Sequence, residues 1–464
     1  MSEVGAASGK ARYRLEPGGT VCGELRVPGD KSISHRALML GSVAEGVTEV
    51  EGFLPSEDCL ATLVAMRSLG IEIERPHPDH VVVRGRAGSA PAGHAGGLLG
   101  LRQAPGPLDL GNAGTAIRLL MGLLAGQPFD STLIGDESLM RRPMERVAAP
   151  LRLMGARILT QDGHPPVRIL AVPALHGIDY ALPVASAQVK SAILLAGLTA
   201  RGRTSVTEPA PTRDHSERML GAFGVKLARS GSTVSLEGGQ IPRAAHVEVP
   251  GDFSSAAFFL VAGCLAARDR LRLENVGVNP TRTGLLTLLR QMGADITVLP
   301  RGTSGRPGAG TAEGGEPVAD IEVRAGALRG IEVPEALVPL AIDEFPAFFI
   351  AAACADGQTV VRGAGELRVK ETDRLAVMAE GLGRLGVEHE LMPDGLRITG
   401  RGGFGGGTVD SRGDHRIAMA FAVASLRASA PIEVLDVANV ATSFPGFADL
   451  ARAAGIRIEA VGAG

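Results

Sequence analysis

Residues 66–73 read MRSLGIEI, an apolar helical stretch that turns at Gly70 into a β-type run, and this short pattern organises the whole chain. It returns as LRLMGARIL (151–159), LGAFGVKL (220–227), LRQMGADI (289–296), LGRLGVEH (382–389) and ARAAGIRIE (451–459). Successive turn glycines are 85, 69, 69, 93 and 69 residues apart. The three equal intervals predict six related units, and the two longer intervals contain insertions at 74–107 and 300–317.

A second helix is predicted in every unit, where a polar turn precedes a run of small and apolar residues. The six copies are GDKSISHRALMLGS (29–42), GNAGTAIRLLMGLL (111–124), SAQVKSAILLAGL (186–198), GDFSSAAFFLVAG (251–263), DEFPAFFIAAACA (343–355) and GDHRIAMAFAVAS (413–425). Few charges follow the first turn of each copy, so these helices are expected to be buried. Three units per domain predict two similar halves that meet near residues 247–255.

The composition of the 464-residue chain limits the possible functions. A net charge of −3 and 3% aromatic residues without tryptophan argue against a nucleic-acid or anionic-membrane surface. No apolar run reaches the roughly 18 residues that cross a bilayer. The first residues lack the apolar core of a secretory signal and are expected to be a disordered lead-in. The four cysteines (Cys22, Cys59, Cys264 and Cys354) are far apart, which indicates a reducing cytoplasm.

Candidate anion-binding groups lie where the buried helices begin, because a helix N-terminus presents free N–H groups and a positive dipole end. In the first unit, Lys31, Ser32 and Arg36 fall within about one and a half turns. Lys31 is one of only five lysines among 47 basic residues, which favours a specific use of its compact, titratable charge. Solvated cations beside an N-cap at Asp30 or Ser32 would explain the same residues.

The second and third units add further candidates. Gly114 would let a ligand approach the backbone, although close helix packing explains a glycine equally well. Arg142 is the second of two arginines before a proline, a pattern that is also common on a solvated face. Ser186 and Gln188 could hydrogen-bond hydroxyls, and Arg213 could bind phosphate through its forked guanidinium, unless these residues are helix caps.

The C-terminal half supplies candidate acid–base groups. Asp343 opens a very apolar helix, either as its N-cap or as a proton acceptor that faces a cleft. In RVKETDR (368–374), Lys370 and Arg374 are predicted to lie on one face of a helix with Glu371 beside them, and a surface ion-pair lattice would look similar. Arg416 adds a cation at the start of the last apolar helix.

Because cations recur at the same place in both halves, the chain is predicted to hold two phosphate-bearing anions in a basic cleft and to join them. The sequence contains no H-E-x-x-H, Walker A or G-x-S-x-G motif, so neither a metal nor another cofactor is expected. His35, His215 and His415 have no metal-ligand spacing and are expected to be hydrogen-bonded structural residues.

The chain resembles the 5-enolpyruvylshikimate-3-phosphate synthase family from about residue 20 to 450. The motifs that carry the resemblance are, in order, GDKSISHRAL, LGNAGTAIRL, RRPM, SAQVKSAILLAGL, TRDHSERM, RVKETDRL, GDHRIAMA and ATSFPGF. The resemblance implies an α/β fold of two similar domains, each of three βαβαββ repeats with buried helices. We expect repeats 1–3 in residues 23–248 and repeats 4–6 in residues 1–22 plus 249–464, with the active site in the cleft between them.

The resemblance also implies an activity. Enzymes of this family transfer the carboxyvinyl group of phosphoenolpyruvate to the 5-hydroxyl of shikimate 3-phosphate and release phosphate, on the pathway to chorismate and aromatic amino acids. A tetrahedral intermediate forms by addition and collapses by elimination. The expected partners are these two small molecules alone, with neither nucleic acid nor membrane, and the expected state is a cytoplasmic monomer.

Roles for individual residues follow from the same resemblance. Asp343 would accept the proton of the attacking hydroxyl, Glu371 would handle the methylene proton, and Lys31 would act with them in catalysis. The residues expected to hold shikimate 3-phosphate are Lys31, Ser32, Arg36, Ser186, Gln188, Arg213, Asp343 and Lys370. Those expected around phosphoenolpyruvate are Lys31, Gly114, Arg142, Gln188, Arg374 and Arg416.

Two positions depart from patterns in the family. Many members have a lysine where this chain has Thr442, so one phosphate contact is expected to be absent or supplied otherwise. SAQVKSAILLAGL and ATSFP resemble the subgroup known for glyphosate tolerance, yet Gly114 stands where its tolerant members have alanine. An added methyl group there would crowd the inhibitor more than the shorter substrate, so the hypothesis is a glyphosate-sensitive enzyme.

Two alternatives fit parts of the pattern. A related enolpyruvyl transferase acts on UDP-N-acetylglucosamine, but that family typically has a K-N motif at the first helix and a reactive cysteine in a mobile loop, whereas this chain has Lys31-Ser32 and cysteines in apolar surroundings. An inactive binding module could keep the anion cleft, but the presence of both Asp343 and Glu371 argues against it.

Overall fold

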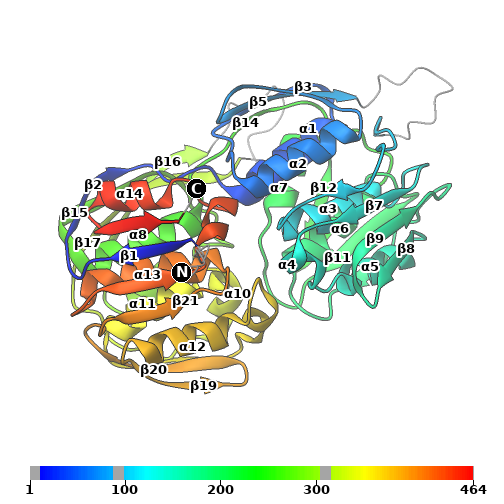
Figure 1. Ribbon diagram of the computed structural model, residues 1–464. Coiled ribbons are helices and arrows are strands. Elements are labelled where there is room, and N and C mark those ends of the chain that lie inside the picture. The colour runs from blue at the N-terminus through cyan, green and yellow to red at the C-terminus, as the bar shows by residue number, and fades with distance from the viewer. Residues whose placement is uncertain (1–10, 87–98, 304–314, 463–464) are drawn as a thin grey trace, which may run out of the picture.

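The computed structural model describes residues 11–86, 99–303 and 315–462, which form two lobes of similar construction (Figure 1). Each repeat glycine lies one or two residues after the end of a helix. These helices are α2 (Glu57–Ser68), α5 (Glu145–Leu153), α7 (His215–Ala222), α9 (Gly284–Gln291), α12 (Arg374–Arg384) and α14 (Phe447–Ala454). All six glycines have a positive φ, from 79° at Gly224 to 113° at Gly455. The left-handed turn that ends these helices therefore explains why glycine recurs.

The second helix of each unit is buried, as predicted. These helices are α1 (Lys31–Val43), α3 (Gly114–Leu124), α6 (Ala187–Gly197), α8 (Phe253–Ala266), α11 (Phe345–Cys354) and α13 (His415–Ala424). In α1 every residue from Ile33 to Val43 is buried. Few charges lie beyond the first turn because the core surrounds these helices, and two that do, Arg36 and Arg118, are buried and hydrogen-bonded.

The described strands form six small sheets, three in each lobe. In the lobe of the first three units the strands are β3 (Glu45–Glu51), β4 (Glu72–His77), β5 (His80–Arg86), β6 (Leu108–Asp109), β7 (Ser131–Ile134), β8 (Arg157–Gln161), β9 (His164–Leu170), β10 (Asp179–Ala181), β11 (Arg203–Thr207), β12 (Leu227–Ser230), β13 (Thr233–Glu237) and β14 (His246–Glu248). Their sheet orders are β14-β3-β5-β4, β6-β7-β9-β8 and β10-β11-β13-β12. Each sheet joins one parallel pair to antiparallel neighbours.

The other lobe has a similar arrangement, except that one of its sheets has three strands, all antiparallel. Its strands are β1 (Arg12–Leu15), β2 (Val21–Leu25), β15 (Ala267–Gly277), β16 (Asp295–Thr303), β17 (Pro317–Arg324), β18 (Asp356–Val361), β19 (Glu388–Met392), β20 (Gly395–Arg401), β21 (Gly407–Asp410), β22 (Ile432–Leu435) and β23 (Ile458–Val461). Their orders are β16-β17-β15-β2, β18-β20-β19 and β21-β22-β1-β23. Of the predicted insertions, residues 87–98 and 304–314 lie outside the described residues, as do residues 1–10 of the predicted lead-in. The expectation that the lead-in is disordered through residue 19 was wrong, because Arg12–Leu15 form β1 between β22 and β23.

Two crossing segments connect the lobes and run side by side. Strand β2 pairs in parallel with β15 of the C-terminal lobe, whereas β14 pairs in parallel with β3 of the N-terminal lobe. Between these strands the Asp30 amide donates to the Pro250 carbonyl at 2.8 Å, and the Asp252 amide donates to the Pro28 carbonyl at 2.9 Å. A Cβ at Gly29 would lie 1.9 Å from the carbonyl oxygen of Gly52, so this contact requires glycine.

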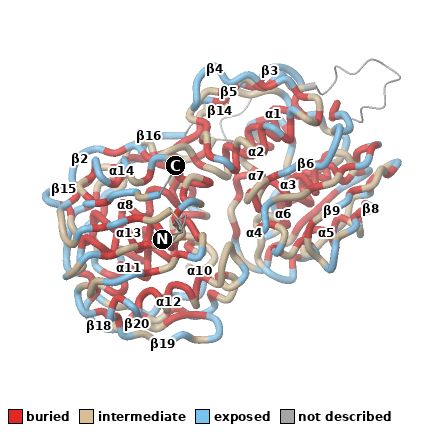
Figure 2. The backbone as a smooth tube through the Cα atoms, viewed as in Figure 1, coloured by how far each residue is buried: buried red, intermediate tan, exposed pale blue. Residues whose placement is uncertain are grey.

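The buried apolar residues fall into two clusters that correspond to the lobes, and Figure 2 shows a buried interior in each. One cluster spans residues 33–249, and the other combines residues 13–27 with residues 253–458. We propose that the domains divide at the crossing segments 28–30 and 250–252, a few residues beyond the boundaries expected from the sequence at 22/23 and 248/249. Among the described residues, no helix is long and apolar enough to span a membrane.

Candidate active site

A polar cleft lies between the two lobes, where the starts of several buried helices meet. Its lining residues are Lys31, Ser32, Asp58, Asn112, Gly114, Thr115, Arg118, Arg142, Arg146, Gln188, Arg213, Asp252, Arg282, Asp343, Val369, Lys370, Glu371, His415 and Arg416. Eight of these side chains are Lys or Arg and four are carboxylates, which leaves an excess of four positive charges. Such a cleft attracts anions.

Lys31 reaches across the cleft from the first turn of α1. The Asp30 carboxylate caps this helix by accepting from the Ile33 amide at 2.9 Å, so Asp30 takes the capping role and Lys31 is left facing the cleft. The Lys31 Nζ donates to Asp58 Oδ2 at 2.5 Å and to Ser443 Oγ, on the opposite lobe, at 2.6 Å. Burial raises the pKa of Asp58, and the neighbouring ammonium of Lys31 opposes that effect.

The start of α3 has no side-chain cap, because Ala113 occupies the N-cap position. Its free N–H groups and the missing side chain of Gly114 leave room for an anion at this helix end. Arg142 lies directly over Gly114, held by Asn112 Oδ1 at 2.6 Å and by Ser138 Oγ at 3.2 Å. The backbone and the guanidinium therefore face the same small volume.

Gln188 is fixed at the start of α6 by two neighbours. Its Oε1 accepts from Arg118 Nη1 at 2.9 Å, and its Nε2 donates to Thr115 Oγ1 at 3.1 Å. Burial, together with the charges of Arg146 and Arg142, lowers the pKa of Arg118 to about 9. The guanidiniums of this group outnumber the carboxylates around them, and the excess positive charge favours binding of anions.

The carboxylate of Asp343 faces the cleft instead of capping α11, whose N-cap residue is Glu344. Arg213 of the opposite lobe donates to Asp343 Oδ2, while Lys370 Nζ and Arg374 Nη1 lie 3.5 and 3.4 Å from Oδ1. Burial alone would raise the pKa of Asp343, but these cations together with Arg416 hold it well below the usual value. Asp343 is therefore an ionised carboxylate that can accept a proton.

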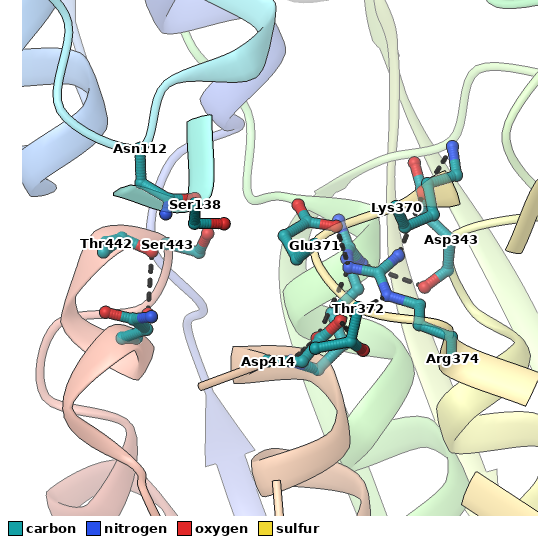
Figure 3. Close-up of polar contacts among 12 residues, drawn as sticks. Asn112, Ser138, Asp343, Lys370, Glu371, Thr372, Arg374, Asp414, Thr442 and Ser443 are labelled. Carbon is teal, nitrogen blue, oxygen red and sulfur yellow. Dashed lines mark hydrogen bonds and ion pairs between the residues drawn. The ribbon is translucent and has the colours of Figure 1, made fainter. Parts of the chain in front are cut away.

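Residues 370–373 are not helical, which corrects the expectation that Lys370 and Arg374 lie on one helix face. A 3-10 helix, η2 (Gly365–Val369), ends before Lys370, and α12 begins only at Arg374 because the Asp373 carboxylate caps it at the Ala376 amide. The turn between them nevertheless brings Lys370 and Arg374 to Asp343 and places Glu371 beside the Arg374 guanidinium (Figure 3).

Glu371 lies beside Arg374, whose Nη2 donates to Glu371 Oε2 at 2.6 Å and whose Nε donates to Asp414 Oδ2 at 2.8 Å. Burial would raise the pKa of Glu371, but the charges of Arg374 and Arg142 hold it well below the usual value. Glu371 is therefore ionised in this structure.

Three of the thirteen expected site residues do not line the cleft. Arg36 lies below the surface, where it donates to the Ser32 carbonyl at 2.9 Å and to Ser216 Oγ at 2.8 Å. Ser186 caps α6, with its Oγ 3.4 Å from the Val189 amide. Arg374 is only 1% exposed and supports Asp343 and Glu371 from behind. The other ten line the cleft: Lys31, Ser32, Gly114, Arg142, Gln188, Arg213, Asp343, Lys370, Glu371 and Arg416.

Thr442 also points away from the cleft. It ends the 3-10 helix η4 (Ala438–Thr442), where its hydroxyl donates to the Asn439 carbonyl at 2.7 Å and its side chain is 4% exposed. The next residue, Ser443, makes the contact with Lys31. Figure 3 shows Thr442 and Ser443 apart from Asp343, although all three belong to the C-terminal lobe.

Several lining residues were not predicted from the sequence. Arg118 could have been found, because it stands four residues after Gly114 and therefore on the same face of α3. Asp58, Asn112 and Arg282 carry no comparable signal, since each is placed in the cleft by side-chain contacts with residues 27, 30 and 252 positions away.

Of the three histidines expected to be hydrogen-bonded structural residues, His35 and His215 make such bonds, whereas His415 lines the cleft and its Nε2 has no hydrogen-bond partner among the described residues. His35 Nδ1 lies 2.8 Å from Thr62 Oγ1, and His215 Nδ1 lies 2.6 Å from Glu316 Oε1. Burial lowers the pKa of His415, so this cleft histidine is neutral. Among the described residues, the group with metal-binding geometry is Glu51, His246 and Glu248, on β3 and β14 and outside the cleft lining.

Comparisons with known proteins agree on one family. A family model described as EPSP synthase (3-phosphoshikimate 1-carboxyvinyltransferase) matches residues 15–450. A protein of Methylococcus capsulatus named 3-phosphoshikimate 1-carboxyvinyltransferase is 58% identical over 448 residues, which is 96% of this chain and 98% of that protein. The relative of that name from Alkalilimnicola ehrlichii is 58% identical over 447 residues, 96% of either chain. A solved EPSP synthase structure from Acinetobacter baumannii is 50% identical, covers 97% of this chain and 99% of its own, and superposes with a TM-score of 0.83.

Proposed function

Because this chain belongs to the EPSP synthase family, we propose that the cleft between its lobes is where its reaction takes place. The chain transfers the carboxyvinyl group of phosphoenolpyruvate to the 5-hydroxyl of shikimate 3-phosphate and releases phosphate. This is a step of the shikimate pathway. The observation that supports the location is the set of eight cations, drawn from both lobes, that surround Asp343 and Glu371.

The two anions are proposed to occupy different parts of the cleft. Lys31, Arg142, Arg416 and the open end of α3 at Gly114 surround the volume proposed for phosphoenolpyruvate. Ser32, Gln188, Arg213 and Lys370 surround the volume proposed for shikimate 3-phosphate. Arg36 and Arg374 do not line the cleft. They would act indirectly, through their hydrogen bonds to Ser32 and Glu371, which do. Forked guanidiniums match the paired oxygens of phosphate and carboxylate.

The proton transfers are assigned to the two carboxylates. In the addition step C3 of phosphoenolpyruvate gains a proton, the 5-hydroxyl oxygen bonds to C2, and the hydroxyl proton passes to Asp343. In the elimination step a base removes a proton from C3, the bond from C2 to the phosphate oxygen breaks, and phosphate leaves. Glu371 is proposed to donate the proton that C3 gains in the addition step and to remove a proton from C3 in the elimination step. Bound anions would offset the positive charges of Arg374 and Arg142 and so raise the pKa of Glu371.

The functional unit is proposed to be a cytoplasmic monomer that binds neither nucleic acid nor membrane. One chain supplies both faces of the cleft, so no second copy is needed to complete it. The four cysteines form no disulfide, in keeping with a reducing compartment. Sedimentation equilibrium and cell fractionation would test these two statements separately.

Phosphate release from phosphoenolpyruvate and shikimate 3-phosphate tests the proposed location. The purified chain should release phosphate only when both substrates are present, and the variants Asp343→Asn and Glu371→Gln should lose most of this activity while still folding. The matched control is Asp356→Asn, an exposed carboxylate at the start of β18. Full activity in folded Asp343→Asn and Glu371→Gln would place the reaction elsewhere.

A further inference from the structure

One loop of the C-terminal lobe hydrogen-bonds to the N-terminal lobe at two residues. Each of these residues is adjacent in sequence to a cation of the cleft, either Lys31 or Arg213. The loop, Asn279–Arg282, follows β15 and precedes α9. The Asn279 and Arg282 side chains are 2% and 3% exposed. Arg282 is one of the eight cations that line the cleft, but neither residue is assigned a proton transfer or a contact with either anion.

Arg282 holds the helix that carries Lys31. Its Nη1 donates to Asp30 Oδ2, while the other oxygen of Asp30 caps α1 at the Ile33 amide. Its Nη2 donates to Ser254 Oγ at 2.5 Å and to Asp252 Oδ1 at 3.3 Å, both at the start of α8. One guanidinium thus joins the starts of two helices that belong to different lobes.

The same guanidinium also reaches a third helix start. Glu344 Oε1, at the N-cap of α11 and directly after Asp343, lies 3.8 Å from Arg282 Nη2 and accepts from Ser254 Oγ. Arg282 therefore ties the residue before Lys31 to the residue after Asp343. Nearby carboxylates raise the pKa of Arg282 against the effect of burial, so its charge is permanent.

Asn279 makes the second contact with the N-terminal lobe. Its Nδ2 donates to Asp214 Oδ1 at 2.7 Å and to Glu316 Oε2 at 2.9 Å. Asp214 occupies the N-cap position of α7 but its side chain caps nothing, because Asn279 and Arg218 use its carboxylate instead. Asp214 follows Arg213, the cation that pairs with Asp343. The loop is braced internally, since Asn279 Oδ1 accepts from the Thr281 amide at 2.9 Å.

We propose that Arg282 and Asn279 are positioning residues, which set Lys31 and Arg213 of one lobe against Asp343 of the other through Asp30 and Asp214. The argument rests on the proposed function of the cleft. The buried guanidinium of Arg282 contacts both lobes and fixes the angle between them at the crossing segments. A small change in that angle would displace the groups of one lobe relative to those across the cleft. A misplacement of about 1 Å at a reacting centre can lower the rate about 100-fold.

The two residues should have different kinetic effects because they act through different cations. Arg282→Gln should lower kcat about 100-fold, since it displaces Lys31 relative to Asp343. Arg282→Lys keeps the charge but loses the fork, so its kcat should fall between those of Arg282→Gln and the wild type. Asn279→Ala should raise the KM for shikimate 3-phosphate about tenfold, through Arg213, with a smaller change in kcat.

The experiment is a steady-state assay of phosphate release by the full-length variants, with kcat expressed per shikimate 3-phosphate site counted by calorimetric titration. This normalisation separates positioning from folding, because a residue that only stabilises the fold changes the number of sites and not kcat per site. Arg290→Gln is the matched control, since Arg290 lies in α9, donates to the Ile296 carbonyl and does not line the cleft. It should retain wild-type kcat.

Folded Arg282→Gln with kcat per site within threefold of wild type would overturn the proposal. If Arg282→Gln does not fold, Arg282→Lys decides, and a wild-type kcat in that variant would overturn it as well. An unchanged KM in Asn279→Ala would remove Asn279 from the proposal. An inactive wild-type enzyme would instead contradict the proposed function, so the two failures are distinguishable.

Discussion

Substitution of Gly114 by alanine should weaken phosphoenolpyruvate binding by a predictable amount. A Cβ at this position would lie 2.7 Å from Arg142 Nη1 and 3.3 Å from Arg118 Nη1, whereas ordinary contacts begin at 3.4 Å. Arg142 must therefore retreat by about 0.7 Å. Asn112 and Ser138 hold that guanidinium in place, so the retreat lengthens its hydrogen bonds and withdraws it from the open end of α3.

The expected loss is about tenfold to 100-fold in kcat/KM for phosphoenolpyruvate, or about 1.4 to 2.7 kcal/mol. Most of the loss should appear in KM, because the displaced group binds the substrate in the ground state as well as in the transition state. The inhibition constant for glyphosate should rise by a larger factor, since the added methyl group crowds an inhibitor that is longer than the substrate.

Initial rates of phosphate release at saturating shikimate 3-phosphate, with phosphoenolpyruvate and glyphosate both varied, give the two constants. The control is Gly221→Ala in α7, where an added Cβ meets no atom within 4 Å. That variant should keep its kinetics and gain stability of up to ~1 kcal/mol. A wild-type inhibition constant in the millimolar range that does not change in Gly114→Ala would refute both the steric argument and the hypothesis of glyphosate sensitivity.

Three further predictions follow from burial and charge. Asp343→Asn should lower kcat by about 10²- to 10⁴-fold, because the variant loses the proton acceptor, and a loss below tenfold in the phosphate-release assay would contradict that role. His35 is buried and uncharged, since burial and then Lys31 and Arg36 lower its pKa from 6.5 to about 3. The unfolded chain takes up a proton there below pH 6.5 and the folded chain does not, so acidification toward pH 3 should cost ~1.4 kcal/mol of stability per pH unit. Thermal unfolding of His35→Gln should show a shallower dependence on pH than the wild type, and equal slopes would contradict the assignment. Thr442→Lys should destabilise the fold and leave the KM for phosphoenolpyruvate no lower than wild type, because the Thr442 side chain is buried against the Asn439 carbonyl, and a lowered KM would show that position 442 reaches the substrate after all.

The repetition of the fold could be predicted from the sequence because its causes are local. A glycine with positive φ follows each of six helices, and a buried helix carries few charges, so both features are visible in single segments. Cations at helix starts were predictable for the same reason. The resemblance then supplied their roles, which spacing alone left open.

The features that could not be predicted depend on contacts between distant segments. Strand β2 pairs with β15 across more than two hundred residues, and no periodicity in the sequence indicates that pairing. The helical interpretation of Lys370 to Arg374 was wrong because the Asp373 cap delays the start of α12. Arg282 was missed because it precedes an ordinary apolar helix, and only its buried contacts with Asp30 and Asp252 distinguish it from a solvated arginine.

The ion pair between Arg213 and Asp343 would link the proposed substrate binding to the proposed proton transfer. Arg213 pairs with the carboxylate that is proposed to accept a proton, and its charge is a main reason why the pKa of Asp343 lies well below the usual value. A phosphate group that draws Arg213 away would remove this restraint, and the pKa of Asp343 would rise toward the range of an effective base. The base would therefore become stronger only when shikimate 3-phosphate, the source of the proton, is in place. The same exchange lets the excess cations of the two lobes approach each other, because the incoming anions offset their repulsion.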